Sequence, residues 1–472
     1  MMEYSNDLNE MIALINTMAV CSSNSDTGYC ISRLTRRIDD DYLMSRASCI
    51  WSAAQDGSGF MDAVGKLAAV CNGERHDCPA CPVRKYCNTY IADAQKGFNP
   101  AAPKIIDLFC GAGGLSLGFT QEGFVTALAN DIEPCCIDTY SHNHPETPRK
   151  HIILGDINSM IGNIPELIRF SEIDVLAGGP PCQGFSMANR QRLIDDPRNH
   201  LYKSYIEVLK LIRPRFFVME NVKGMLSVVH QVIEDFEGVG YTVSAKILNA
   251  KDFGVPQNRE RLIFIGNRTG HDNEAVFRRI EEIGAGLPER TLSEALYGLR
   301  PLSAGRVKNA TAAESDETGR IIDKSTGMTN EYIEAINQGR HISTVFNHKA
   351  RYNNDRDIEI FCRLDPGDRS DDPKIADIMP YARRNGIFKD KYFKLEPDKV
   401  CKTITAHMKF DCNMYIHPCQ ARGLTPREAA RVQSYPDDYF FRGAYTKTYM
   451  QIGNSVPPML GGVIARAIKE QL

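Results

Sequence analysis

The sequence lacks the features that would place it in or across a membrane. No run of 18 apolar residues is present, so a membrane-spanning helix is excluded. The first residues, MMEYSNDLNEMIALINTMAV, put acidic side chains ahead of the apolar stretch and lack the positive start of a secretory signal. We find no internal repeat and no low-complexity tract. A soluble, cytoplasmic globular protein is expected.

Charge of one sign is also lacking, because the net charge is only -3. This balance gives no global attraction to nucleic acid, although a local basic cleft would not appear in the sum. The chain has 472 residues, which favours two or three domains, and a chain of this length needs no disulfide bonds to be stable. Its 15 cysteines are scattered apart from one cluster, and such a cluster more often binds metal.

Short apolar runs alternate with amphipathic stretches after Lys104. The runs are IIDLF (105–109), VTALAN (125–130), IDVLAG (173–178), FFVMEN (216–221) and RLIFIG (261–266). Strands separated by segments of helix length predict an α/β fold with an open, mainly parallel sheet and helices on both faces. Near the end of the chain, LTPREAARVQSYP has the N-cap, first-position proline and Glu428 of a capping box, so a helix should begin at Thr425.

Changes in composition predict the domain organisation. Residues 1–100 hold the only tryptophan and the cysteine cluster, and they end in the turn-rich Gly97-Phe98-Asn99-Pro100. Residues 101–297 form the main α/β domain. The polar, Asp- and Arg-rich stretch 298–418 interrupts the alternation and is expected to be an insertion, and 419–472 complete the main domain.

A glycine-rich turn follows the first expected strand in DLFCGAGGLSLGF (107–119). Such a loop allows a ligand to approach the backbone near the first N–H groups of a helix. Asp131 follows the second strand and Asp156 the third, where a ribose hydroxyl is commonly held. A tight turn with two solvated acids is the simpler alternative, but the shared position favours a nucleoside site.

The stretch GGPPCQGFS (178–186) stops a buried strand sharply and presents Cys182 at its end. Glu220 also ends a buried strand, and Arg259 and Arg261 should alternate on one face of the strand in QNRERLIFIG (257–266). These groups should open onto one cleft at the carboxyl edge of the sheet. An ordinary ion pair and a small apolar cysteine remain the alternative interpretation.

These motifs, together with QIGNSVPP (451–458), resemble in their order the signature set of the DNA (cytosine-5)-methyltransferases. The resemblance covers roughly 104–297 and 400–472 and implies an S-adenosylmethionine-dependent methyltransferase fold with a target-recognition domain inserted late in the chain. It implies a cytosine pocket formed by Cys182, Glu220, Arg259 and Arg261. It implies a cofactor site lined by Phe109, Gly111, Gly113, Asp131, Asp156, Asn454 and Pro180, which also borders the cytosine pocket.

By the same resemblance, Cys182 attacks carbon 6 of a cytosine flipped out of double-stranded DNA, which activates carbon 5 for methylation. Ser186, Arg190 and Arg192 lie in a polar loop and are candidate phosphate contacts. We expect a nucleoid-associated monomer on DNA, which is either part of a restriction-modification system with a cognate endonuclease or an orphan modification enzyme. A tRNA cytosine methyltransferase and a non-catalytic DNA-binding regulator are the rival functions.

The N-terminal cluster VCNGERHDCPACPVRKYC presents Cys71, Cys78, Cys81 and Cys87 at a spacing that suits one tetrahedral zinc or a four-iron cluster. The spacing resembles the iron–sulfur loop of endonuclease III and MutY-type glycosylases, which favours a four-iron four-sulfur cluster, with zinc as the alternative. The preceding residues show no convincing glycosylase catalytic lysine, so base excision is not expected.

Overall fold

The computed structural model describes residues 84–87, 90–91, 94–95, 99, 101–168, 172–181, 200–310, 313–380, 391–410 and 412–472. The expectations for Cys71, Cys78, Cys81, Cys182, Ser186, Arg190 and Arg192 fall outside these residues.

A seven-stranded sheet of order β3-β2-β1-β4-β5-β8-β6 forms the centre of the main domain. Its strands are β1 (Lys104–Leu108), β2 (Val125–Asp131), β3 (Ile152–Leu154), β4 (Val175–Gly178), β5 (Phe216–Val222), β6 (Thr242–Asn249) and β8 (Glu260–Asn267). The pairs among β1 to β5 are parallel, which confirms the mainly parallel sheet that the apolar runs predict. The strand expected at 261–266, β8, differs: it runs antiparallel to both β5 and β6, because it turns back as a hairpin instead of crossing over.

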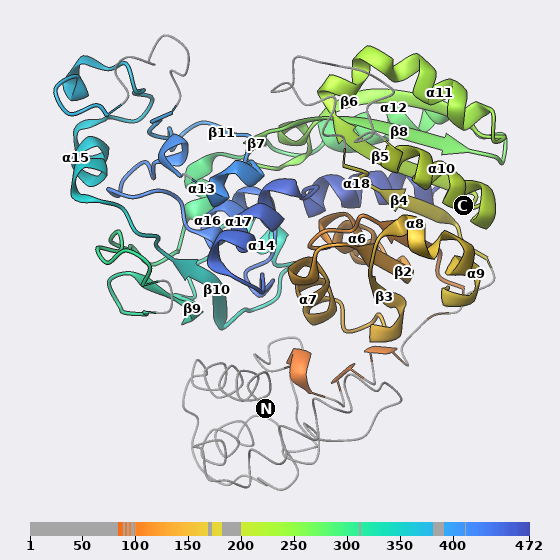
Figure 1. Cartoon of the computed structure of the whole chain (residues 1–472), viewed down its shortest axis with the longest axis horizontal. Helices are drawn as coiled ribbons and strands as arrows, with labels where there is room; N and C mark the ends of the chain where they lie inside the picture. The colour runs from red at the N-terminus through yellow and green to blue at the C-terminus, as the bar shows by residue number, and fades with distance from the viewer. Residues whose placement is uncertain are drawn as a thin grey trace, which may run out of the picture.

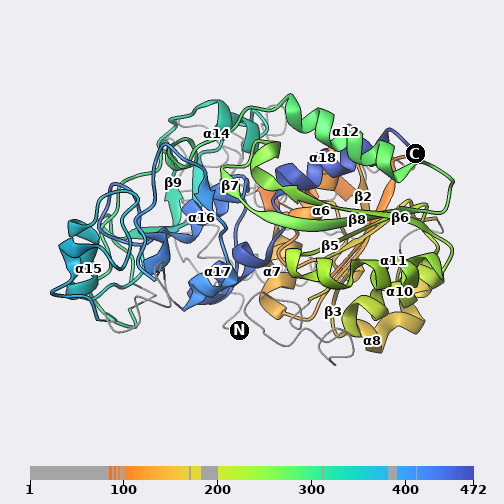
Figure 2. The same cartoon turned by 90° about the horizontal axis from the view of Figure 1, so that it is seen from above.

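Helices cover both faces of the sheet, as predicted. One face packs against α6 (Gly114–Gln121), α12 (Asn273–Ala285) and α18 (Pro458–Lys469). The other packs against α8 (Ile157–Met160), α9 (Ile164–Leu167), α10 (His200–Ile212) and α11 (Val229–Glu237). Figure 2 shows α12 and α18 on one side of the strands and α10 and α11 on the other. Helix α7 (Pro134–Asn143) packs against β2 and β3.

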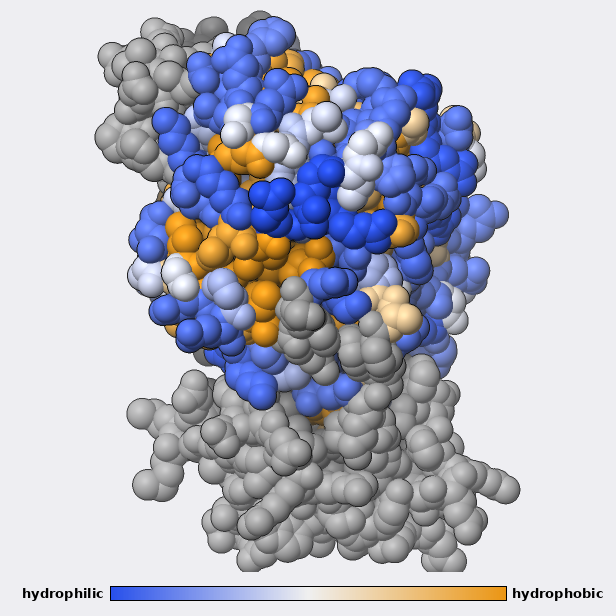
Figure 3. Space-filling model, turned by 90° about the vertical axis from the view of Figure 1, so that its right-hand side faces the viewer, coloured by the Kyte–Doolittle hydropathy of each residue, from blue (hydrophilic) through white to orange (hydrophobic). Residues whose placement is uncertain are grey.

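The end of the molecule near α9, α10 and the C-terminus carries an apolar area framed by hydrophilic residues (Figure 3). Leu211 of α10 is 44% exposed, and the neighbouring Ile212 is only partly buried against the core of that face.

A second body of structure lies beside the sheet and consists mostly of residues 292–454 (Figure 1). It contains α13 (Leu292–Leu296), β9 (Gly319–Lys324), α14 (Glu331–Ile336), β10 (Thr344–Lys349), α15 (Asp355–Arg363), α16 (Pro426–Val432) and α17 (Tyr445–Asn454). Strands β9 and β10 pair antiparallel, and β11 (Cys401–Lys402) pairs parallel with β7 (Gln257–Asn258). Short 3-10 helices cover Arg84–Tyr86, Arg149–His151, Ile161–Asn163, Lys223–Val228, Ala250–Phe253, Pro373–Ile375, Ala406–Lys409 and Asn413–Tyr415.

One apolar core crosses the boundaries expected at 298 and 418. It contains Leu292 of α13, Tyr332 of α14, Ala429 of α16 and Ile404, which precedes the 3-10 helix Ala406–Lys409. It also includes Ala112 from the glycine-rich turn. The expected insertion and the C-terminal segment therefore pack as one body against the turn that follows β1.

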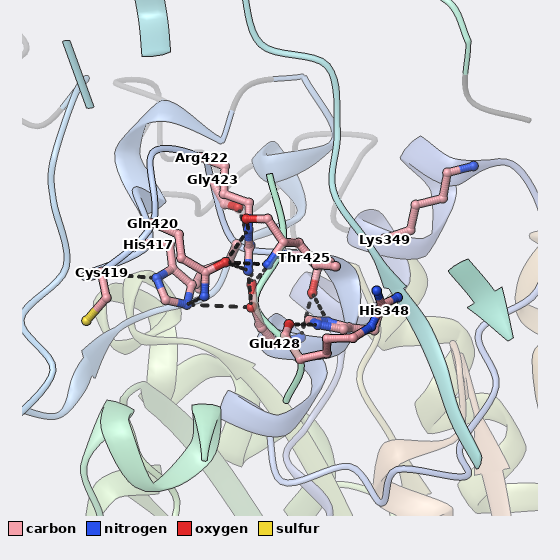
Figure 4. A network of polar contacts seen from close by, with 12 residues as sticks. His348, Lys349, His417, Cys419, Gln420, Arg422, Gly423, Thr425 and Glu428 are labelled. Carbon is pink, nitrogen blue, oxygen red and sulfur yellow. Dashed lines mark hydrogen bonds and ion pairs between the residues drawn. The ribbon is translucent and has the colours of Figure 1, made fainter. Parts of the chain in front are cut away.

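Helix α16 starts as the sequence predicts. The Thr425 side chain accepts a hydrogen bond from the Glu428 N–H, and the Glu428 carboxylate accepts one from the Thr425 N–H, which is the reciprocal capping box. Figure 4 shows how far this cap extends: the Thr425 hydroxyl also meets His348 of β10, and Glu428 meets Arg422.

Candidate functional site

The expected site residues gather at the carboxyl ends of the parallel strands. The chain order reverses between β1 and β4, since β2 lies on the outer side of β1 and β5 lies on the outer side of β4. Loops diverge at such a reversal and leave a crevice at the strand ends, where ligands of open α/β sheets bind. The glycine-rich turn follows β1 and the Gly-Gly-Pro-Pro segment follows β4, so the two motifs flank this crevice.

The glycines of the first turn serve different purposes. A side chain at Gly114 would lie 2.2 Å from the Ser455 hydroxyl and 2.3 Å from the Val456 carbonyl oxygen, and one at Gly113 would lie 2.8 Å from Nε2 of His144. Among the described residues, nothing lies within 4 Å of where a side chain at Gly111, which has a φ of +54°, would stand. Packing therefore requires Gly113 and Gly114, whereas Gly111 leaves open space of the kind that a ligand needs.

Asp131 is the last residue of β2 and shapes this turn. Its carboxylate accepts hydrogen bonds from the backbone N–H of Gly111 and of Glu133, both at 2.8 Å. Burial raises the pKa of Asp131 above its ordinary value, and the two amide hydrogen bonds oppose that rise. Asp156 is exposed and caps α8 by accepting from the Asn158 N–H at 2.9 Å. Both acids lie at strand ends, as expected, and both also have structural partners.

Two apolar side chains at this edge were missed by the sequence analysis. Ile132, directly after Asp131, is 65% exposed, and Leu154 at the end of β3 is 49% exposed. Both residues stand at the carboxyl ends of strands, the edge at which open α/β sheets bind ligands. Neither position carries a recognisable motif, because any apolar residue fits the pattern of a strand end.

Glu220 of β5 and the segment leading to Cys182 lie together. A side chain at Gly179 would lie 3.0 Å from Oε2 of Glu220, and the Asn221 side chain donates to the Pro180 carbonyl at 3.1 Å. Cys182 itself is outside the described residues, but the chain passes the Glu220 carboxylate just before reaching it. Gly179 is thus needed to leave room beside Oε2 of Glu220.

The two arginines of QNRERLIFIG have different partners. Nε of Arg261 lies 2.8 Å from Oε1 of Glu220, and both side chains are partly exposed. Arg259 is buried, and its guanidinium donates to the carbonyls of Ile404, Gly453 and Ser455 at 2.7 to 3.1 Å. Burial lowers the pKa of Arg259. The sequence analysis placed both arginines on one strand face, but Arg259 precedes β8 and holds the C-terminal motif.

That C-terminal motif reaches the glycine-rich turn from the far side. Asn454 ends α17 with an exposed side chain, between two residues whose carbonyls Arg259 holds. A side chain at Gly453 would lie 2.2 Å from the backbone of Thr405 and Ala406, and Ser455 packs on Gly114. The path of the chain therefore carries Asn454 to the same edge as Gly111.

Only Cys87 of the four clustered cysteines is described, and it is buried. No group of three or more His, Cys, Asp or Glu side chains that could hold a metal occurs in the described ranges, which omit Cys71, Cys78 and Cys81. Within the same ranges, no helix is both long and apolar enough to cross a bilayer.

Comparisons with known proteins agree with this geometry. The profile of the C-5 cytosine-specific DNA methylases matches residues 103–470. Type II methyltransferase M1.HphI of Haemophilus parahaemolyticus is 35% identical over 373 residues, which cover 77% of this chain and 86% of that protein. Type II methyltransferase M.DdeI of Desulfomicrobium norvegicum is 35% identical over 390 residues, covering 77% and 88%.

The fold is shared as well. A crystal structure described as a DNA modification methyltransferase encoded within an E. coli prophage superposes with a TM-score of 0.59 at 24% identity, over 78% of this chain and 99% of that one. The profile match extends over well more than half of the sequence, and the relatives are aligned over most of their own lengths. This chain is a DNA methyltransferase that belongs to the C-5 cytosine-specific DNA methylase family.

Proposed function

We propose that the enzyme methylates carbon 5 of cytosine within one short sequence of double-stranded DNA, using S-adenosylmethionine, as a modification enzyme with or without a cognate restriction endonuclease. The observation that carries the proposal is the Glu220–Arg261 pair. It lies at the same sheet edge as the open Gly111 and beside the segment that leads to Cys182. The relatives named type II methyltransferases favour DNA over tRNA as substrate.

The residues at the crevice suit S-adenosylmethionine, which when bound supplies the electrophilic methyl group. Gly111 leaves space against the backbone, and the exposed Ile132 offers an apolar surface to a purine ring. The carboxylates of Asp131 and Asp156 can accept from a ribose or an amino group, and Asn454 reaches the same edge. Phe109, with a φ of 56°, Gly113 and Pro180 complete the proposed wall of the site.

Cys182 is proposed to add as a thiolate to carbon 6 of the cytosine, which makes carbon 5 nucleophilic enough to accept the methyl group. A base then removes the carbon 5 proton, and the thiolate leaves as the carbon 5–carbon 6 double bond re-forms. Glu220 is proposed to hold a proton against ring nitrogen 3 while the thiolate adds. Arg261 fixes Oε1 of Glu220, so that Oε2, beside Gly179, is directed at the base.

Carbon 6 cannot be reached inside a duplex, so the cytosine must be flipped out at a cost of roughly a few kcal/mol. Ser186, Arg190 and Arg192 are proposed to contact phosphates during this step, and residues 298–418 are proposed to recognise the target sequence. Arg259 is proposed to act indirectly, without contacting the base. It donates hydrogen bonds to the carbonyls on either side of Asn454 and to the carbonyl of Ile404.

The four-cysteine cluster is proposed to hold a four-iron four-sulfur cluster in a separate N-terminal unit, and its spacing is what supports this. The profile match begins at residue 103, so the family relationship does not extend to the cluster. Anaerobically purified protein should be brown with about four irons per chain, as a cluster of this type requires. Colourless protein with one zinc would replace the iron–sulfur assignment by a tetrahedral zinc site.

The function is tested by bisulfite sequencing of DNA from cells that express the wild type or Cys182→Ser. Methylated cytosines in one short context, absent with the variant, are expected. Methylation that persists with Cys182→Ser would contradict the thiolate mechanism, and no methylation with the wild type would contradict the DNA substrate. Duplexes with 5-fluorocytosine in that context should trap a covalent adduct, since fluorine cannot leave as the proton does.

A further inference from the structure

The short helix Arg84–Tyr86, which lies before the region matched by the family profile, is bound to the C-terminal part of the enzyme. Arg84 is buried and makes an ion pair with Asp438. Arg340 holds the same carboxylate with both of its terminal nitrogens, at 2.8 and 3.1 Å. Asp438 therefore joins the N-terminal segment to the turn that precedes the expected cofactor motif QIGNSVPP.

Lys85 contacts the same place from the next position. Its Nζ donates to the Asp438 carbonyl at 2.7 Å and to the side-chain oxygen of Asn143 at 2.6 Å. Asn143 is the last residue of α7, and its side chain also exchanges hydrogen bonds with the backbone of Phe440, at 2.9 and 3.0 Å. Lys85 thus fastens the end of α7 to residues 438–440.

The fastened turn touches the glycine-rich loop. Tyr439, which is buried, donates its hydroxyl hydrogen to the carbonyl of Ala112, and Nε2 of His144 lies 3.2 Å from the same hydroxyl. His144 is the residue that a side chain at Gly113 would strike. The hydroxyl of Tyr439 therefore fixes the loop that contains Gly111 and Gly113, and Tyr439 is held between Asp438 and Phe440.

We propose that Arg84 and Lys85 are positioning residues that keep the glycine loop in its binding shape through the turn Asp438–Phe440, and so raise the affinity for the cofactor. The inference rests on the proposed S-adenosylmethionine site. No contact with the cofactor is required of either residue, because each acts through Tyr439 and Ala112. Arg84 and Lys85 are then a working part of the methyltransferase, although they precede the region matched by the family profile.

The test uses the full chain with Arg84→Met and Lys85→Met combined, since methionine keeps an apolar stem of similar length. The dissociation constant of S-adenosylhomocysteine, measured by calorimetry, should rise roughly tenfold, the loss expected from loosening one well-formed hydrogen-bonded contact. KM for S-adenosylmethionine should rise in parallel, with kcat changed less than about twofold, because the loop binds but does not react. The conservative variant Arg84→Lys should retain much of the wild-type affinity for S-adenosylhomocysteine, because lysine keeps the positive charge.

Arg279→Met is the matched control, because Arg279 also pairs with a carboxylate, that of Glu470, but on the exposed surface of α12. It should leave the dissociation constant at the wild-type value. If the double variant binds S-adenosylhomocysteine like the wild type, or loses affinity for DNA alone, the inference is overturned. If the wild type binds none, the cofactor assignment fails, and the inference falls with it.

Tyr439→Phe tests the same path from its other end and keeps the inference falsifiable should the double variant misfold. It removes one hydroxyl and retains the buried ring, and it should weaken the binding of S-adenosylhomocysteine by a similar factor. In a double-mutant cycle the effects of Arg84→Met and Tyr439→Phe should be clearly less than additive, since both loosen one connection. Fully additive effects, or no effect of Tyr439→Phe, would show that the Arg84 contact does not reach the loop.

Discussion

Two arginine–carboxylate pairs in this enzyme differ mainly in how completely the protein satisfies them. In the pair Glu428–Arg422 both side chains are 1% exposed, and the guanidinium holds both carboxylate oxygens, at 2.8 and 2.6 Å (Figure 4). In the pair Glu220–Arg261 the side chains are 13% and 15% exposed, and the closest approach is between Nε of Arg261 and Oε1 of Glu220, at 2.8 Å. One pair is enclosed by its own fold, and the other opens onto the crevice.

The surroundings of the enclosed pair show what complete satisfaction involves. Arg422 also donates to the Leu302 and Gly423 carbonyls, and Glu428 accepts from the Thr425 N–H. Burial alone would raise the pKa of Glu428, but Arg422 brings it well below the ordinary value. A carboxylate used in this way has little capacity for a substrate, whereas Oε2 of Glu220 is bordered by Gly179, which has no side chain.

The largest effect is expected from Glu220→Gln, which keeps the shape of the side chain but removes the ionisable carboxyl group. Methyl transfer in a single turnover should fall roughly 10²- to 10⁴-fold, the usual range for a lost acid–base group. The free energy of unfolding should fall by less than the roughly 3 to 5 kcal/mol of a fully buried broken pair, because glutamine can still accept a hydrogen bond from Arg261. Near-normal turnover, measured with radiolabelled cofactor, would assign Glu220 to structure instead.

Arg422→Met should show the opposite pattern. Removing one partner of a buried pair leaves Glu428 charged and enclosed, so the free energy of unfolding should fall by about 3 to 5 kcal/mol. Activity per folded molecule should stay within about threefold of the wild type, because the proposed reaction assigns no role to Arg422. The folded fraction is determined from circular dichroism in denaturant. An active-site defect at full stability would remove the distinction between the pairs.

The sequence predicted the strands of the sheet and the start of α16 well, because both depend on local signals. Apolar runs of strand length mark β1, β2, β4 and β5, and the Thr425–Glu428 box marks a helix start wherever it occurs. The direction of β8 could not be predicted, because it depends on the hairpin with β6 and not on the residues of β8.

The partners of the two arginines could not be predicted from the sequence either. Arg259 and Arg261 stand two positions apart, yet Arg259 binds carbonyls from residues 404 to 455, and Arg261 binds Glu220. Such partners come from distant parts of the chain, so they cannot be predicted from composition or from the spacing of residues. The exposed Ile132 is a similar case, since only the fold distinguishes it from the buried apolar residues of β2.

The enclosed network should also respond to pH, through His348. Its Nε2 lies 2.8 Å from the Arg300 carbonyl and its Nδ1 3.2 Å from the Thr425 hydroxyl, and burial lowers its pKa to about 4 against the opposing charge of Glu428. Arg422 and Arg431 also lower it. A folded pKa below that of the unfolded chain means that stability is complete above about pH 6.5 and is lost as the pH falls toward 4.

His348→Gln should therefore flatten the dependence of the unfolding free energy on pH between about 6.5 and 4, by at most roughly 3 kcal/mol. His417, whose pKa burial also lowers to about 4, stays in the variant and keeps part of the slope. The measurement is urea unfolding at a series of pH values. An unchanged slope would mean that His348 is protonated in the folded enzyme, and that the network tolerates a further buried charge.

The smallest effect is expected from a third pair, Lys223–Glu260. This pair tests whether burial or position at the strand ends makes a charged pair functional. Its atoms are 2.9 Å apart at the same end of the sheet as Glu220, but its side chains are 52% and 44% exposed. Lys223→Met should change the unfolding free energy by less than about 1 kcal/mol. The difference from the wild type should disappear in high salt, because salt screens exposed charges. Methyl transfer should stay within about threefold of the wild type, since an exposed ion pair fixes neither loop nor carboxylate. A fall in affinity for DNA that grows weaker with added salt would instead make Lys223 a phosphate contact, and position at the strand ends, more than burial, would then mark a functional charge.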